Sequence, residues 1–171
     1  MESDPLDLHE RGVERIWERA LLVDATRLFE KVAANVAYHA RRYRGEPGFD
    51  EWIGAILDLA IDELCEEDRW EELKGLPVAD PEEPRYAVLI DETGIEEGCA
   101  RKACVLFNSL PVEERRTFYA VFIDLKTIHQ HVAQGNGPPN WVVAQLEHAI
   151  RTISGLGSYD APPPKREDFL P

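Results

Sequence analysis

Two cysteines and two histidines have the side chains best suited to holding a metal ion. Cys99 and Cys104 have four residues between them, whereas the cysteine pair of a zinc site usually has two. His129 and His131 are two residues apart on one predicted helix and therefore point in different directions. The sequence also lacks a phosphate-binding glycine loop, a nucleophile elbow and a paired-histidine metal motif. We therefore expect no metal, no other cofactor and no enzymatic activity.

Three arginines at the end of a predicted helix form a second group that could bind a ligand. Arg41, Arg42 and Arg44 lie where the apolar pattern of residues 25–43 ends. Cations at a helix C-terminus interact favourably with the helix dipole, so helix capping alone explains these arginines. Arginines in this position are equally suited to contact DNA phosphates. The sequence leaves both interpretations open.

The third group lies on a predicted helix-turn-helix, in which a helix at 126–134 and a glycine-containing turn precede a helix at 140–153. The apolar stripe of the last helix predicts that its other residues face outward: Asn140, Trp141, Val143, Ala144, Gln145, Glu147, His148 and Arg151. The amides of Asn140 and Gln145 could pair with adenine edges. Arg151 is the only Arg or Lys on this face, and Lys126 is a further cation nearby, so phosphate contacts would be few. The alternative is a helical domain that binds protein.

Composition limits the class of protein. The chain has 171 residues, 44% of them hydrophobic, which predicts a folded protein. Its net charge of −14 repels phosphate backbones. Any DNA contact must therefore be confined to a local surface, or a partner must supply the positive charge. No apolar run approaches the ~18–20 residues of a membrane span. An odd number of cysteines and an acidic N-terminus without a signal peptide predict a cytoplasmic protein with reduced thiols.

The periodicity of apolar residues predicts an all-α fold with two small helical domains. The first domain covers residues 1–74 and has helices at 8–21, 25–43 and 49–64. The clearest stripe is that of the third helix: Phe49, Trp52, Ile53, Ile56, Leu57, Ala60, Ile61 and Leu64. Three packed helices of this length make a three-helix bundle.

Residues 75–98 are rich in proline, glycine and acids, and we predict an acidic linker between domains there. The apolar island Tyr86–Ile90 within it is either a short strand or a segment docked on a helical domain. Residues 99–153 form the second, helix-turn-helix domain, and 154–171 form a flexible tail. A helix is predicted at 99–109, followed by another helix. Four side chains of that second helix are predicted to face the core: Phe118, Val121, Phe122 and Leu125.

The order of several short motifs resembles the extracytoplasmic-function (ECF) sigma factors of bacterial RNA polymerase. The promoter-reading segment of that family resembles a run of residues here: Arg42, Tyr43, Arg44, Gly45, Glu46, Phe49, Trp52 and Leu59–Leu64. Its C-terminal DNA-binding domain resembles a second set: Leu110, Pro111, Arg115, Phe118, Ala133, Gly137, Pro139, Val142, Leu146, Ala149 and Arg151. The resemblance covers nearly the whole chain.

The resemblance implies a sigma region 2-like domain followed by a sigma region 4-like domain. It implies that helix 25–43 binds core RNA polymerase, with Leu28, Glu30, Lys31 and Asn35 in that contact. It also implies promoter contacts by a wider set: Arg41, Arg42, Arg44, Trp52, Lys126, Asn140, Gln145, His148 and Arg151. The sequence favours Trp52 as a core residue of the third helix over this contact. An ECF-type sigma factor directs promoter recognition in transcription initiation, and anti-sigma factors are further partners in the family.

Two departures from the family pattern favour a second interpretation. Leu57-Asp58 replace an Arg-Asn pair, and Cys65-Glu66-Glu67-Asp68 replace a basic run at the end of the third helix. Acids at a site that faces phosphates add repulsion. The alternative is therefore a sigma-like adaptor or mimic, which binds polymerase or an anti-sigma factor without sequence-specific DNA binding.

Overall fold

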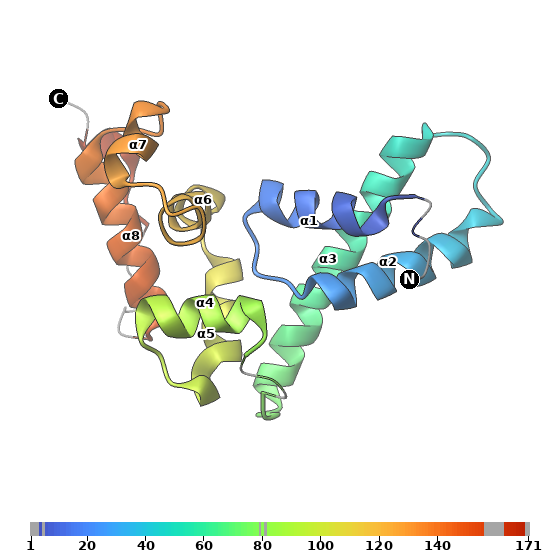
Figure 1. The fold of residues 1–171 in the computed structure, drawn as a ribbon, viewed down its shortest axis with the longest axis horizontal. Helices are drawn as coiled ribbons and strands as arrows, with labels where there is room; N and C mark the ends of the chain where they lie inside the picture. The colour runs from blue at the N-terminus through green and yellow to red at the C-terminus, as the bar shows by residue number, and fades with distance from the viewer. Residues whose placement is uncertain (1–3, 5, 79, 81, 156–162, 170–171) are drawn as a thin grey trace.

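The structure is a computed structural model that describes residues 4, 6–78, 80, 82–155 and 163–169. All regular elements of these residues are helical, which confirms the predicted all-α class (Figure 1). The α-helices are α1 (Leu8–Arg19), α2 (Ala25–Ala40), α3 (Phe49–Leu73), α4 (Pro84–Thr93), α5 (Ala100–Ser109), α6 (Val112–Phe118), α7 (Ile128–Ala133) and α8 (Pro139–Ile153). Shorter elements are η1 (Glu97–Cys99), η2 (Tyr119–Ile123) and η3 (Arg166–Phe169). No helix in the described part is long and apolar enough to cross a membrane.

Helices α1, α2 and α3 pack around a first core, on one side of the molecule in Figure 1. The predicted stripe of α3 supplies its centre, and Ile53, Ala60 and Ile61 have no exposed surface. Phe49, which begins α3, is 42% exposed and does not join the core. The acidic residues that follow Leu64 form the end of this helix, as predicted, and it runs to Leu73 because no glycine or proline interrupts the chain before Gly75.

Ion pairs join α1 to α3 along the side of this core. Arg15 Nη2 lies 2.6 Å from Asp58 Oδ2, and Arg19 Nη2 lies 2.6 Å from Asp62 Oδ1. The hydrogen bond from Arg15 lowers the pKa of Asp58 below its ordinary value, although partial burial opposes this effect. Asp58, which departs from the ECF pattern, therefore has a partner within the chain.

Helices α4, α5, α6 and α8 and the segment η2 surround a second core. The island Tyr86–Ile90 lies in α4, so the strand interpretation is wrong. Pro84 begins this helix and Gly94, with φ of 68°, ends it. Tyr86 and Leu89 are buried against α5, which confirms the alternative of a docked segment.

The chain after α6 departs from the predicted regular helix. Residues 119–123 form a π-helix, whose extra residue per turn shifts the register of the side chains that follow. Leu125 has a positive φ of 54° and is 78% exposed, so its predicted inward position is wrong. Helix α7 then begins at a capping box in which the Thr127 and Gln130 side chains and backbones bond reciprocally.

The two cores meet along the irregular link between α1 and α2. Side chains alternate between the cores here: Ala20 and Leu22 belong to the second, whereas Leu21 and Val23 belong to the first. The Asn108 amide of α5 holds this link, since its Oδ1 accepts from the Leu22 N–H at 2.8 Å and its Nδ2 donates to the Leu22 carbonyl at 2.9 Å. The Tyr119 hydroxyl donates to the carbonyl of Leu21. The domain boundaries at 74, 98 and 153 therefore remain a prediction.

The predicted tail is described only in part. Helix α8 ends at Ile153, and residues 156–162 and 170–171 lie outside the described residues. Between them, Arg166 of η3 places its guanidinium 5.8 Å from the centre of the Trp141 ring, so this part of the chain contacts α8.

Replacing Asn108 by alanine should destabilise the protein by about 1–3 kcal/mol, because the N–H of buried Leu22 loses its partner and the Leu22 carbonyl keeps only the weak Cys104 thiol donor. Urea denaturation followed by circular dichroism measures this change. Ser109→Ala is the matched control, since its exposed hydroxyl bonds only within α5. Equal stability of Asn108→Ala and the control would show that the link does not depend on Asn108.

Candidate functional site

The end of α2 and the start of α3 carry exposed arginines beside aromatic rings. We call this the basic–aromatic surface: Tyr38, Arg41, Arg42, Tyr43, Arg44, Phe49 and Trp52. The three arginines are exposed, although Glu46, Asp50 and Glu51 lie in the same stretch. Asp50 has its Oδ1 2.9 Å from Arg11 Nη1, which removes part of this negative charge. The surface is therefore locally close to neutral on a protein of charge −14.

The aromatic rings of this surface form a stack. The rings of Tyr43 and Trp52 are nearly parallel at 4.6 Å, and Phe49 lies 6.0 Å from Trp52. The Tyr43 hydroxyl donates to the Pro47 carbonyl at 2.9 Å and fixes the turn between the helices. Trp52 is half-buried and packs against the first core, as expected of a core residue, and its contact with DNA stays a prediction.

Tyr38 lies beside one of the arginines. It is 65% exposed, and the Arg42 guanidinium lies 5.5 Å from the centre of its ring. Exposed aromatic faces bind unpaired bases by stacking, and neighbouring arginines contact the phosphates of the same strand. The chemistry of this surface thus fits a single-stranded nucleic acid.

The residues of α2 predicted to bind polymerase do not share one exposed face. Leu28 is 1% exposed in the first core, so the prediction that its side chain contacts a partner is wrong for this arrangement. Lys31 is bonded to Glu67 at 2.6 Å. Glu30 is exposed, and the buried Asn35 Nδ2 has no hydrogen-bond partner among the described residues.

The acidic end of α3 is paired within the chain. Glu67 accepts from Lys31 and, at 3.1 Å, from Arg27, both on α2. The Lys31 bond lowers the pKa of Glu67 below its ordinary value, so the charged form is favoured. Glu67 therefore holds α2 on α3.

Asp68 extends this pairing into the second half of the protein. It is 2% exposed and accepts a short hydrogen bond from Arg85 Nη1 of α4, which is 6% exposed. Burial raises the pKa of Asp68, and the neighbouring Arg85 charge opposes that rise. Arg101 of α5 bonds the Leu76 carbonyl at 2.6 Å and lies 3.2 Å from Glu71. The end of α3 is thus tied to α4 and α5.

Helix α8 presents fewer polar groups than its sequence predicted. Gln145 is 1% exposed and accepts from the Thr117 hydroxyl at 2.9 Å, and Trp141 is also buried, so their predicted outward orientation is wrong. The reason is that α5, α6 and α7 all pack on α8 and widen its buried arc. The His148 Nδ1 lies 2.7 Å from the buried Glu114 carboxylate, whose pKa burial raises.

The remaining predicted DNA contacts of this half are Asn140, Arg151 and Lys126. Asn140 and Arg151 are exposed on α8, and Arg151 lies 3.8 Å from Glu147. Lys126 is half-buried and lies 3.2 Å from Asp124. Each of the two cations thus has a nearby carboxylate, which weakens its attraction for phosphate.

A buried polar network joins α6, α7 and α8. Asn136 donates to the His131 carbonyl at 3.0 Å and lies 3.4 Å from its Nδ1, while His131 Nε2 lies 3.5 Å from the Thr117 hydroxyl. These partners suit a neutral ring protonated on Nε2. Burial, with a smaller contribution from Lys126, lowers the pKa of His131.

The four residues weighed as a zinc set lie in different surroundings. Cys99 and His129 are exposed, whereas Cys104 and His131 are buried. Burial raises the pKa of the Cys104 thiol, which disfavours the thiolate that a metal needs. Across the described ranges, no three or more His, Cys, Asp or Glu side chains are grouped to hold a metal ion.

No protein-family model, curated protein or solved structure matches this chain.

Two contacts of the site left no signal in the sequence. The Asp68–Arg85 pair joins α3 to α4, and the Asn108 amide joins α5 to the link between α1 and α2; each of these residues alone resembles a surface residue. The aromatic surface was different, because Tyr43 and Trp52 stood out by type and spacing.

The buried pair Asp68–Arg85 gives a first prediction for this region. Asp68→Ala leaves a buried guanidinium short of its partner and should cost about 3–5 kcal/mol of stability. The double variant Asp68→Leu/Arg85→Met should recover most of that loss, because two buried charges are replaced by apolar groups. Chemical denaturation of both variants measures these free energies of unfolding. The prediction is wrong if Asp68→Ala is as stable as the wild type.

His131 gives a pH-dependent prediction. Because its folded pKa lies below the ordinary 6.5, its stabilising effect is present above that value and lost as pH falls through it. The wild type should therefore lose stability relative to His131→Gln between about pH 7.5 and pH 5. Glu114, whose raised pKa acts in the opposite direction, is common to both proteins and cancels in the difference. A difference that does not change with pH would rule out a neutral buried His131.

Proposed function

We propose that the protein is an ECF-type sigma factor, a non-enzymatic subunit that binds core RNA polymerase and directs promoter recognition. The observation that carries this proposal is the basic–aromatic surface. Its stacked Tyr43 and Trp52 rings and exposed Arg41, Arg42 and Arg44 suit an unpaired DNA strand. All of these residues except Arg41 are also ones on which the resemblance to the promoter-reading segment of that family rests.

The surface lies at the end of α2, the helix assigned to polymerase in this proposal. Glu30 is the exposed residue of the predicted polymerase contact, and Lys31 is occupied by Glu67. A factor bound to polymerase through α2 would bring the adjacent arginines and rings to DNA. The polymerase would also supply positive charge that a chain of −14 lacks.

The exposed face of α8 favours a second candidate, a sigma-like adaptor or mimic that does not read duplex DNA by sequence. Gln145 is buried in α8, and the exposed Arg151 has Glu147 nearby. A recognition helix in the major groove needs exposed base-reading and phosphate-binding groups, and few remain here. This adaptor would bind polymerase or an anti-sigma factor through the same helices.

A pull-down on purified core RNA polymerase, followed by run-off transcription from a genomic promoter library, separates the two functions. Binding with promoter-specific transcripts is the expected outcome for a sigma factor. Binding without transcripts would replace it with the adaptor, and absence of binding would contradict both the sigma factor and a polymerase-binding adaptor.

The arginines of the basic–aromatic surface can be tested separately. The triple variant Arg41→Ser/Arg42→Ser/Arg44→Ser should weaken binding to a single-stranded oligonucleotide, and the slope of log affinity against log salt should fall by about 2, at roughly 0.7 per lost contact. Arg69→Ser is the matched control, because Arg69 is an exposed arginine of α3 paired with Glu66. Fluorescence anisotropy at several salt concentrations measures both values, and an unchanged slope in the triple variant would remove this surface from the proposal.

A further inference from the structure

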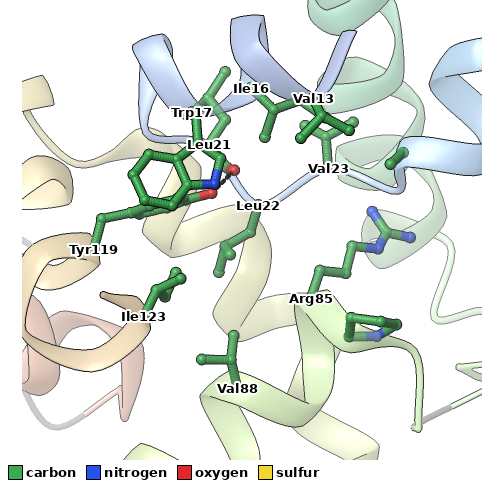
Figure 2. Close-up of a pocket in the computed structure, with 12 residues that line it drawn as sticks. Val13, Ile16, Trp17, Leu21, Leu22, Val23, Arg85, Val88, Tyr119 and Ile123 are labelled. Atoms are coloured by element: carbon green, nitrogen blue, oxygen red, sulfur yellow. Dashed lines mark hydrogen bonds between the residues drawn. The ribbon is translucent and has the colours of Figure 1, made fainter. Parts of the chain in front are cut away.

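An apolar pocket of about 220 Å³ lies where the two cores meet (Figure 2). Helix α1 supplies Val13, Ile16 and Trp17, and the link supplies Leu22. From the second half come Val88 of α4 together with Tyr119 and Ile123 of η2. The pocket therefore has walls from both halves of the protein.

One wall of the pocket is aromatic. The rings of Trp17 and Tyr119 lie 5.9 Å apart, nearly perpendicular, and Figure 2 shows them side by side next to Ile123. Trp17 is 50% exposed, although it lies on a helix that otherwise packs on the first core. A flat apolar ligand could cover part of this ring and remove apolar surface from water.

The charges around the pocket select against an anion. Arg85 is the one charged residue of its lining, and Asp68 and Glu83 already pair with that guanidinium. A second hollow shares Val13 and Trp17 with the pocket and adds the exposed carboxylates of Glu14 and Glu18. A ligand with a carboxylate would meet no free cation here and would lose hydration without compensation.

We propose that this pocket binds a small uncharged aromatic molecule of about two fused rings. Apolar cavities of roughly 150 Å³ bind benzene, so a pocket of 220 Å³ has space for a bicyclic ring. The occupant would touch α1, the link, α4 and η2 together, and its binding would stabilise the contact between the two cores. This inference is independent of the function proposed above.

Indole and indole-3-carboxylate are matched probes, because they share a ring system and differ by one negative charge. Calorimetry should show that indole binds and that the carboxylate binds at least ~10-fold more weakly. At ~10 times its dissociation constant, indole should raise the unfolding temperature by roughly 3–6 °C.

Val88→Trp fills the pocket from α4 and should abolish indole binding, and Val13→Trp does the same from α1 if the first variant does not fold. Val143→Trp is the control, since it adds the same ring to an exposed site on α8. The proposal is overturned if indole does not bind up to its solubility, if both pocket variants still bind it, or if the carboxylate binds equally well.

Discussion

The hydrogen bonds between the Asn108 amide and the Leu22 backbone are the contact on which the arrangement of the two halves depends. They hold a link whose successive side chains enter different cores, so its register decides the packing of both. A shift of the link by one residue would exchange Leu21 and Leu22 between the cores. The amide satisfies the donor and the acceptor of Leu22 together and so fixes this register.

The acids of α3 have a related structural role. Asp58 and Asp62 bind arginines of α1, Glu67 binds α2, and Asp68 binds α4. Each of these carboxylates therefore acts inside the molecule, and their charge is partly neutralised there. The acidity that argued against DNA binding in the sequence is, at these positions, largely a feature of helix packing. The exposed arginines of the basic–aromatic surface are on the other end of α3 from Asp68.

Periodicity predicted the helices well where one face of a helix packs on one core. The stripe of α3 is an example, since Ile53, Ala60 and Ile61 are fully buried. Periodicity failed on α8, because neighbouring helices contact this helix from several sides. Gln145 is therefore buried, and its side-chain oxygen accepts a hydrogen bond from the Thr117 hydroxyl. Periodicity also failed at Leu125, because a π-helix changes the register and has no distinct sequence signature.

The candidate site was predictable only in its local parts. Arg41, Arg42, Arg44 and Trp52 lie close in the chain, so their proximity follows from one turn between two helices. The residues predicted to contact polymerase could not be checked without knowing which face of α2 is free, and that depends on Lys31 pairing with α3. The pocket between the cores required the arrangement of α1, α4 and η2, which no local pattern specifies.

The Asn108–Leu22 hydrogen bonds and the Asp68–Arg85 pair together hold the two halves in one arrangement. Pulsed electron paramagnetic resonance between spin labels on the exposed positions Ala55 of α3 and Gln134 after α7 tests it directly. Cys99→Ser removes the exposed native thiol, Cys104 is fully buried, and burial raises the pKa of Cys65 to about 11, so stray labelling is suppressed. We expect one narrow distance distribution, which broadens when Asn108→Ala and Asp68→Ala are combined. A broad distribution in the otherwise unaltered protein would contradict it.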